Sequence, residues 1–470
     1  MINLETMNKI NRIYTYLMAC LILSVTGCEF GDTNINPATP ADVSAQAIVP
    51  AAQTGMAFAI GGEMVRINGL FMQHFEGINA QQFDNYQYLV FASDMDGVWR
   101  RTYANSLNPF ITILRKAEDE GSNHTAAMSK VMIAHGLGSL ADMFGDIPYS
   151  DAFGGLENNF FPTYDTQEEI YTTIQSLLDD AIIELAGDAG IGPALGADDL
   201  MFGGDTDQWI RVAHSLKAKY FLHTSKVNAN AYSNALTELA DGISSNSEDF
   251  EFIFGSATNE ANPQYQFTQD RGGNIAIETF FFDLLNNLSD PRRDQLLTID
   301  ATDPTGYNKD FNSGTYYTKI NSPVIFMSYS EMKFIEAEAE LMGNADVVAA
   351  EAALAEGISA SMMKINGADD AAYAAANSDL QSLATQAEQL EQIMTQKYIA
   401  LYSHGLESWT DFRRTGYPAI TPVTGGNNAF NLNGEVPRRL PYPQTEIDLN
   451  ADNVPIASPD FQARFWWDAN

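Results

Sequence analysis

Residues 331–363 read EMKFIEAEAELMGNADVVAAEAALAEGISASMM, and this stretch predicts the fold. Two runs with helical periodicity, Glu331 to Leu341 and Val347 to Met363, flank the polar break Gly343-Asn344-Ala345-Asp346. Small residues in both runs allow two helices to approach closely, namely Ala337, Ala339, Ala350 and Ala353. Helical hairpins of this kind stack into superhelices of the tetratricopeptide type, although the strict consensus with its Trp and Leu-Gly positions is missing. The stretch therefore predicts a scaffold of helical pairs.

Helical periodicity dominates most of the remaining sequence. The predicted helices span residues 45–60, 63–76, 97–119, 123–143, 166–186, 207–226, 230–241, 328–342, 345–364 and 380–403. Three other segments, 144–165, 244–328 and 410–470, are rich in Gly, Pro, Asn and aromatic residues. We interpret them as long, loop-rich insertions with a few short β-strands, and their aromatic content argues against disorder. The predicted fold class is mainly α.

The composition limits the classes of function. The chain has 470 residues with a formal net charge of −36, from 61 acidic and 25 basic residues. Hydrophobic residues make up 45% and charged residues 18%, which is enough apolar material for a large core. An acidic surface of this size repels phosphate backbones, so we expect no nucleic-acid partner.

The N-terminus has the features of a lipoprotein signal peptide. Lys9 and Arg12 precede an apolar run from Ile13 to Val25, and Val25-Thr26-Gly27-Cys28 follows directly. A basic start, a short apolar segment and a small residue before cysteine are typical of such a signal. The run is too short to span a bilayer comfortably. We expect Cys28 to carry the lipid; an unmodified cysteine after an ordinary signal peptide is the alternative.

This interpretation divides the chain into three parts. Residues 1–27 are the predicted leader, residues 28–44 a lipidated tether rich in turn-forming residues, and residues 45–470 a single domain. Translation starts at Met1 or at Met7, since the acidic Glu5 is unusual in such a leader. Cleavage before Cys28 removes the other cysteine, Cys20, so we expect a mature chain without disulfides.

Several segments, in their order along the chain, resemble one family. They are DTNINP (32–37), WRRTY (99–103), LADMFGDIPYSDA (140–152), DPR (290–292), MSYSEMKFIEAEA (327–339), SHGLESWTDFRRTGYP (403–418) and PRRLPYPQTE (437–446). Together they resemble the SusD/RagB-like nutrient-binding lipoproteins of the Bacteroidetes outer membrane. The segment 140–152 is the most specific of these matches, and the resemblance covers nearly the whole predicted mature chain.

The resemblance implies a SusD-like fold and a binding function without catalysis. It implies a lipid-anchored protein exposed at the cell outer membrane, which captures oligo- or polysaccharide for a SusC-like TonB-dependent transporter. Some members of the family bind peptides, so an oligopeptide-binding lipoprotein is the second hypothesis. The family pattern assigns no catalytic residues and no cofactor.

Sugar capture needs flat aromatic faces beside polar groups. Three predicted loops, 81–88, 262–271 and 307–317, offer this mixture in regions where the family's ligand aromatics broadly lie. The candidate ligand residues are Phe83, Asp84, Asn85, Tyr86, Tyr88, Tyr265, Phe267, Arg271, Tyr307, Asn308, Tyr316 and Tyr317. For each single aromatic residue, core packing is an equally open interpretation.

The sequence offers no recognisable catalytic or metal motif. His-Glu-x-x-His, a phosphate-binding glycine loop and a Gly-x-Ser-x-Gly elbow are all absent from it. Asp94-Met95-Asp96-Gly97 begins like a calcium loop but lacks the later ligands, so we expect a solvated turn and no metal. Paired carboxylates for glycoside cleavage stay open among the 61 acidic residues, as does a pure protein-binding scaffold.

Four arginines form a local basic excess near the C-terminus: Arg413, Arg414, Arg438 and Arg439. An anion site is one interpretation of this excess. Internal pairing with carboxylates is the favoured one, because a guanidinium group suits bidentate carboxylate contacts.

Overall fold

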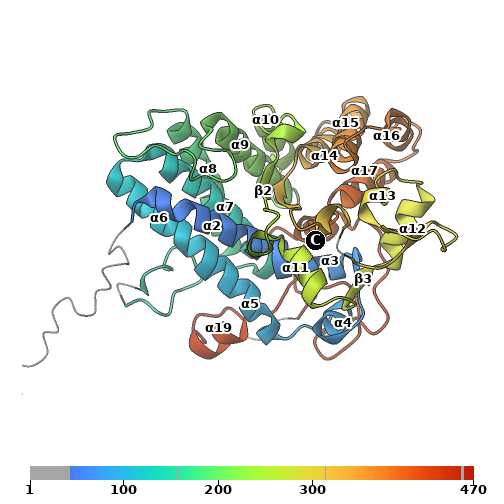
Figure 1. The fold of residues 1–470 in the computed structure, drawn as a ribbon, viewed down its shortest axis with the longest axis horizontal. Helices are drawn as coiled ribbons and strands as arrows, with labels where there is room; N and C mark the ends of the chain where they lie inside the picture. The colour runs from blue at the N-terminus through green and yellow to red at the C-terminus, as the bar shows by residue number, and fades with distance from the viewer. Residues whose placement is uncertain (1–42, 156–157, 313, 457–459, 470) are drawn as a thin grey trace, which may run out of the picture. The chain divides into compact units, whose positions relative to one another are not determined.

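Helices form the framework of the protein in the computed structural model, which describes residues 43–155, 158–312, 314–456 and 460–469. The predicted leader and Cys28 lie outside the described residues. Figure 1 shows α14 to α17 gathered on one side of residues 45–470, α2 and α5 to α9 on the other, and α10 between them. The mainly α, SusD-like fold class is confirmed.

The helices have the following bounds. The first set is α2 (Ala45–Ala59), α3 (Val65–Phe71), α4 (Ala80–Tyr86), α5 (Ala92–Thr102), α6 (Asn108–Glu120), α7 (Asn123–Phe144), α8 (Gln167–Leu185), α9 (Thr206–His223) and α10 (Ala231–Leu239). The second set is α11 (Pro263–Asp270), α12 (Thr279–Asn287), α13 (Arg293–Leu296), α14 (Tyr329–Ala339), α15 (Val347–Asn366), α16 (Ala371–Ser378), α17 (Gln386–Ala400), α18 (Gly405–Thr415) and α19 (Gln444–Leu449). Consecutive helices α6 to α10 pack against one another, as do α14 and α15. The predicted helical pair in residues 331–363 is thus present.

The described residues form three antiparallel two-stranded sheets, two of which join segments distant in sequence. β1 (Phe75–Gly77) pairs with β3 (Ile275–Ile277), and β2 (Phe250–Ile253) pairs with β6 (Pro323–Met327). β4 (Thr298–Ile299) pairs with β5 (Tyr307–Asn308). The segment 244–328 therefore contains α11, α12 and α13 as well as strands, and is more ordered than the expected loop insertion.

One long predicted helix is divided in the structure. The expected helix 97–119 consists of α5, a π-helical segment Tyr103–Leu107 and α6. Pro109 has no N–H for the carbonyl of Asn105, which interrupts regular α-helical bonding there. That carbonyl lies so close to α2 that a side chain at Gly55 would meet it at 1.9 Å.

The expected helix 380–403 begins later than predicted. Thr385 and Glu388 form a capping box, with the Thr385 backbone N–H donating to Glu388 Oε2 at 2.8 Å, so α17 starts at Gln386. α16 precedes it and was not predicted. In the same way the boundary expected at residue 410 is wrong, because α18 continues to Thr415 and ends at Gly416, whose φ is +83°.

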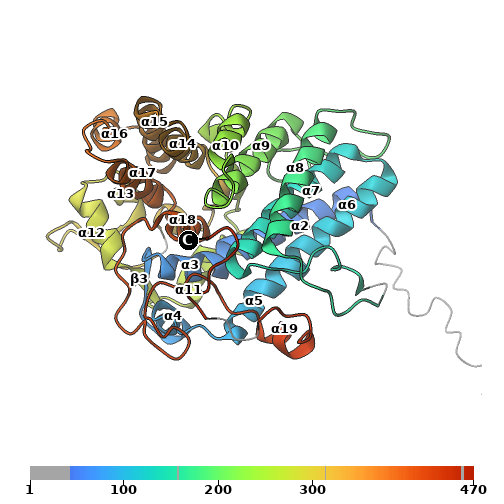
Figure 2. The same cartoon turned by 180° about the vertical axis from the view of Figure 1, so that it is seen from behind.

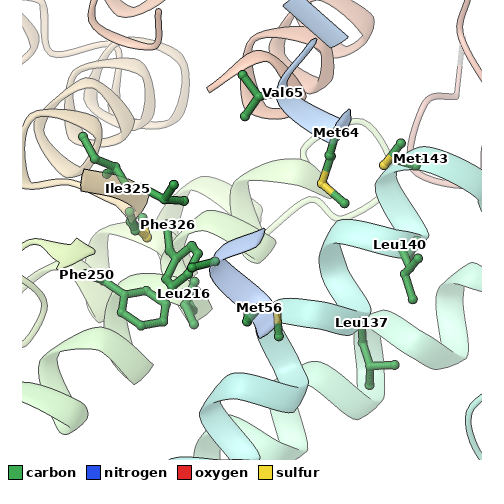
Figure 3. Packing of buried hydrophobic residues seen from close by; sticks show 14 of the residues in the cluster. Met56, Met64, Val65, Leu137, Leu140, Met143, Leu216, Phe250, Ile325 and Phe326 are labelled. Carbon is green, nitrogen blue, oxygen red and sulfur yellow. The ribbon is translucent and has the colours of Figure 1, made fainter. Parts of the chain in front are cut away.

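The core is centred on α7, in which every residue from Thr125 to Phe144 is buried. Figure 3 shows Leu137 and Leu140 of this helix near Met56 and Met64. A helix that is buried on all sides needs small residues where its neighbours cross. At Gly138 an added Cβ would lie 2.1 Å from the Tyr220 hydroxyl of α9.

A buried charge network lies beneath the segment 403–418 and joins four helices. Glu407 of α18 accepts from Lys219 Nζ at 2.7 Å and from His223 Nε2 at 3.2 Å. Lys219 also contacts Glu331 of α14 at 3.1 Å, and Lys397 of α17 lies 3.6 Å from Glu407. All these side chains are buried. Removing one partner from such a network leaves its counter-charge uncompensated in the interior.

The four C-terminal arginines divide into two kinds. Arg414 pairs with Glu338 at 2.7 Å and Arg438 pairs with Asp468 at 2.5 Å, as expected for internal ion pairing. Arg413 instead donates to the carbonyl of Asp142 at 2.7 Å and lies 3.7 Å over the Trp409 ring. Arg439 donates to the carbonyl of Phe144 and stacks on Phe465. Ion pairing was therefore wrong for Arg413 and Arg439, because aromatic rings and helix-end carbonyls hold them.

The buried imidazoles have opposite pKa shifts. Burial lowers the pKa of His74, His135 and His404 to about 3, which keeps them neutral. Burial also disfavours the charged form of His223, but the nearby carboxylates outweigh burial and raise its pKa. Burial would raise the pKa of Glu407, yet the charges of Lys219 and His223 hold it well below its ordinary value.

Gly405 gives a direct test of the close packing between α18 and α3. A Cβ at this position would lie 2.5 Å from the backbone nitrogen of Gly69. Overpacking against backbone costs about 1–3 kcal/mol, so we expect Gly405→Ala to lower the free energy of unfolding by about 2 kcal/mol in urea titration. Gly196→Ala is the matched control, since a Cβ there meets no atom within 4 Å. Equal stability of the two variants would contradict the packing.

Acidification should destabilise the protein from about pH 6.5 downwards. The three neutral histidines have a folded pKa of about 3, below their ordinary 6.5, so the unfolded chain binds more protons in this range. Their stabilisation is present above pH 6.5 and is lost as the pH falls. His223 acts in the opposite sense, as do Asp249, whose pKa burial raises to about 6, and Glu331, whose pKa burial also raises. We expect the three histidines, whose pKa values lie furthest from the ordinary value, to outweigh these groups, and Glu407 adds a further loss below pH 4.5. Thermal unfolding between pH 7.5 and 4 measures this; a constant Tm would contradict it.

Candidate functional site

Two of the three predicted ligand loops are short helices that face one cleft. The region 81–88 lies on α4 and just after it, and the region 262–271 lies on α11. A cleft of about 280 Å³ opens between these helices, α3 and the end of α5. Its lining comprises Phe58, Gly62, Glu63, Arg66, Ala80, Gln81, Gln82, Arg101, Pro263, Gln266, Phe267, Asp270, Arg271 and Asn274. Figures 1 and 2 both show α11 next to α3, α4 and α5.

A π-helical segment, Ile60–Met64, fixes α11 over the cleft. Gly62 has non-helical dihedral angles, φ −92° and ψ −116°, so the backbone departs from regular helical geometry there. Gln264 of α11 donates from Nε2 to the carbonyls of Gly61 at 2.6 Å and Gly62 at 3.1 Å. Asn262 caps α11 by accepting from the backbone N–H of Gln264 and of Tyr265. Hydrogen bonds thus join the π-helical segment Ile60–Met64 to α11, and both elements line the cleft.

The cleft carries charged groups from three elements. The guanidinium of Arg66 lies over the Phe267 ring, 4.3 Å from its centroid. Arg101 approaches the backbone of Gly62, where an added Cβ would be 3.8 Å from its Nη1. The pKa of Arg66 is lowered to about 10, mainly by burial and also by the nearby charge of Arg101, while the charge of Glu63 acts against both. Burial also raises the pKa of Glu63.

Amide groups and aromatic rings supply the remaining chemistry. Gln81 Nε2 donates to Asp94 Oδ1 at 2.9 Å, and Gln266 Nε2 donates to the carbonyl of Ala261 at 2.8 Å. The rings of Phe58 and Phe267 are half-buried and border the open space. Such a surface can pack against the C–H face of a sugar while polar groups take its hydroxyls.

A second hollow adjoins the cleft and extends it. It has a volume of about 930 Å³ and lies along α2, α5 and the π-helical segment Tyr103–Leu107. Phe58 and Arg101 line both spaces, and Arg100 lines the second one. The two spaces together offer an elongated surface, which suits a chain-like ligand.

The candidate residues of the first two regions have different positions. Phe267 and Arg271 line the cleft, and Phe83 is exposed on α4. Asp84 and Tyr265 are half-buried beside the cleft helices, and the Tyr86 hydroxyl donates to Glu278 at 3.1 Å. The role of these residues in ligand binding stays a prediction.

Three candidates are core residues, which corrects the set. Tyr88 is completely buried, its ring packs edge-on against Phe71 at 5.8 Å, and its hydroxyl accepts from the backbone N–H of Val423. Asn85 and Tyr317 are also buried. Their side chains leave no surface for a ligand, because long-range packing covers them.

The third region lies apart from the cleft lining. Tyr307 and Asn308 form β5, and Arg293 lies over the Tyr307 ring at 5.5 Å. Tyr316 is half-buried and packs edge-on against Tyr317 at 4.9 Å. The structure therefore brings two of the three predicted regions together and leaves this one outside.

Sequence reasoning missed five cleft residues: Phe58, Glu63, Arg66 and Arg101 on predicted scaffold helices, and Gln266 within the second ligand region. They fall mostly within helices assigned to the scaffold. The available signal was the pair Arg100-Arg101 in an otherwise acidic chain. The solvated turn expected at residues 94–97 is also corrected, because Asp94 and Asp96 lie within α5, where Asp94 caps the helix by accepting from the backbone N–H of Phe91.

Within the described ranges, no cluster of three or more His, Cys, Asp or Glu side chains has the arrangement of a metal site. Nor does any helix of the described part of the chain have the length and apolarity to cross a bilayer.

Comparison with known proteins gives the following. A SusD-like family model, described as starch-binding and associating with the outer membrane, matches residues 37–443. A SusD/RagB family protein from Bacteroides thetaiotaomicron has 24% identity, with 91% of this chain and 99% of that chain covered and a TM-score of 0.75. A chitin-binding SusD homolog from Flavobacterium johnsoniae has 22% identity, coverage of 90% and 99%, and a TM-score of 0.76. None of the curated proteins matches this chain.

Proposed function

The chain belongs to the SusD-like family, and we propose on this premise that it is a cell-surface protein that binds oligo- or polysaccharide without cleaving it. The observation that supports the proposal is the cleft between α3, α4, α5 and α11, which combines the Phe58 and Phe267 rings with amide and charged groups. Rigid rings order at little entropic cost, and a few polar groups fix the ligand's orientation. The family description as starch-binding and the chitin-binding structural neighbour are consistent with this ligand class.

The proposed partner is a SusC-like TonB-dependent transporter of the outer membrane, to which the protein delivers its ligand. The description of the family as associating with the outer membrane supports this location. The proposed arrangement is a leader of residues 1–27, a tether of residues 28–44 lipidated at Cys28, and a binding body of residues 45–470.

Catalysis on the same scaffold has one observation in its favour. Glu63 and Asp270 both line the cleft, and burial raises the pKa of Glu63, as in a general acid. Incubation with oligosaccharides followed by product analysis separates the two functions, because a binding protein releases no products.

Removing the Phe267 ring should weaken glycan binding. We expect Phe267→Ala to raise the Kd about tenfold, since a stacking ring contributes about 1.4 kcal/mol. Isothermal titration calorimetry against a panel of neutral and acidic polysaccharides measures it, with Phe160→Ala as control because that ring is 64% exposed and outside the cleft. Micromolar or weaker affinity is expected of an open surface. Binding of peptides but of no glycan would replace the proposal by the oligopeptide hypothesis.

Membrane attachment should depend on Cys28. We expect Cys28→Ala to give a protein that is released from the membrane fraction but folds normally, because the core lies in residues from Ala45 onwards. Cell fractionation with labelled fatty acid measures attachment, and circular dichroism with thermal unfolding measures folding. A variant that stays in the membrane fraction, or that no longer folds, would contradict the proposed separation of a lipidated tether from the folded body.

A further inference from the structure

Three guanidinium groups in the cleft form no salt bridge in the described part of the chain; Glu63 acts on Arg66 and Arg101 through its charge but pairs with neither within 4.0 Å. Across residues 43–155 and 158–312, which contain this site, Arg66, Arg101 and Arg271 form no salt bridge within 4.0 Å and their side chains make no hydrogen bond. The Nε atom of Arg66 is buried and without a hydrogen-bond partner. A buried donor without a hydrogen-bond partner is energetically costly. The unpaired Nε of Arg66 therefore points to a ligand group that accepts a hydrogen bond from it.

This arrangement contrasts with other buried arginines of the chain. Arg292 pairs with Asp290 at 2.6 Å, and Arg414 pairs with both Glu338 and Asp411 at 2.7 Å. With 61 acidic residues in the chain, carboxylate partners are abundant. Arg413 and Arg439 form no ion pair either, but both donate to backbone carbonyls, whereas the side chains of Arg66, Arg101 and Arg271 make no hydrogen bond in the described part of the chain.

The cleft holds its positive charge in a fixed geometry. The Phe267 ring covers one face of the Arg66 guanidinium, which leaves the in-plane N–H groups for hydrogen bonds. The pKa of about 10 for Arg66 is below its ordinary value because of burial, but far enough above neutrality to keep the group charged at pH 7. Besides burial, the charge of Glu63 raises the pKa of Arg66, and the charges of Arg101 and Arg271 lower it. An anion bound beside the three arginines relieves their mutual repulsion.

Two carboxylates share the lining, Glu63 and Asp270, so the formal charge of the lining is three positive minus two negative, or +1. Neither forms a salt bridge with the three arginines in the described part of the chain. In a chain with a formal charge of −36, even a small positive region is a marked local reversal, and it attracts an anion over short range.

The positive groups also continue along the groove. Arg100 is exposed in the adjoining hollow of about 930 Å³, which shares Phe58 and Arg101 with the cleft. A single small anion would use one end only, whereas a polymer with repeated negative groups can contact both.

We propose that the cleft selects anionic glycans, binding the carboxylate of a uronic acid or a sulfate ester through Arg66, Arg101 and Arg271. The inference rests on the proposed glycan-binding function and names the substrate class of that site. Arginine binds both anions through paired N–H donors, which lysine does not reproduce.

Titration calorimetry of the full mature protein with matched pairs of glycans tests the inference. The uronate pair is oligogalacturonate and its methyl ester; the sulfate pair is a sulfated galactan and its desulfated form. We expect one charged form to bind at least about tenfold more tightly than its neutral counterpart, with the preference reduced by NaCl. The pair that shows the difference identifies the anion.

Arg101→Gln combined with Arg271→Gln should remove the preference, since both residues are accessible and the change does not disturb the core. Arg211→Gln is the control, because Arg211 pairs with Glu248 outside the cleft. Phe267→Ala should lower the affinity for charged and for neutral glycans by the same factor. Equal binding of charged and neutral forms would overturn the inference and leave the proposed function intact. Binding of acidic peptides but of no glycan would overturn both.

Discussion

The buried contact between Lys219 and Glu407 is the interaction on which the rest of the interior depends. Lys219 lies on α9 and Glu407 on α18, almost 190 residues later by the numbering, and their side chains meet at 2.7 Å. Two charges out of water are stable only when each is compensated by the other and by further polar groups. Here His223, Glu331 and Lys397 supply those groups, so the helices that carry them are fixed relative to one another. The segment 403–418 is thus conspicuous in the sequence because its charged residues face inward.

The long helices could be predicted because their signal is local. Residues 331–363 contain the apolar spacing, the polar break and the alanines of α14 and α15, and no distant residue is needed to recognise them. The segment 60–64 shows the opposite case. Its π-helical geometry is stabilised by Gln264, which is 203 residues away from Gly61. A pattern read along the chain predicts a break at residues 61–62, between the expected helices 45–60 and 63–76, but not the π-helical geometry or the distant contact that stabilises it.

The candidate site was predictable only in part for the same reason. Phe267 and Arg271 belong to a short segment dense in aromatic and polar residues, which marks it as a binding region. Arg66 and Arg101 sit on regular helices, and only the folded chain shows that both face the same space. Tyr88 has the same composition signal as Phe83, yet it is buried while Phe83 is 42% exposed. Composition cannot distinguish these two side chains, because contacts from residues such as Val423 decide their burial.

The late position of Glu407, Asp411 and Arg414 has a consequence for biosynthesis. A nascent chain that has emerged only as far as α17 has Glu331 beside Lys219 and Asp142 beside His223, but it lacks Glu407 and Asp411, the acids that Lys397 contacts in the folded protein. Closing the interior around the Lys397 ammonium without these acids is unfavourable, because a buried charge needs a partner. The helix α18 therefore completes the charge balance of the interior, so the central helices can close fully only after nearly the whole chain has been synthesised.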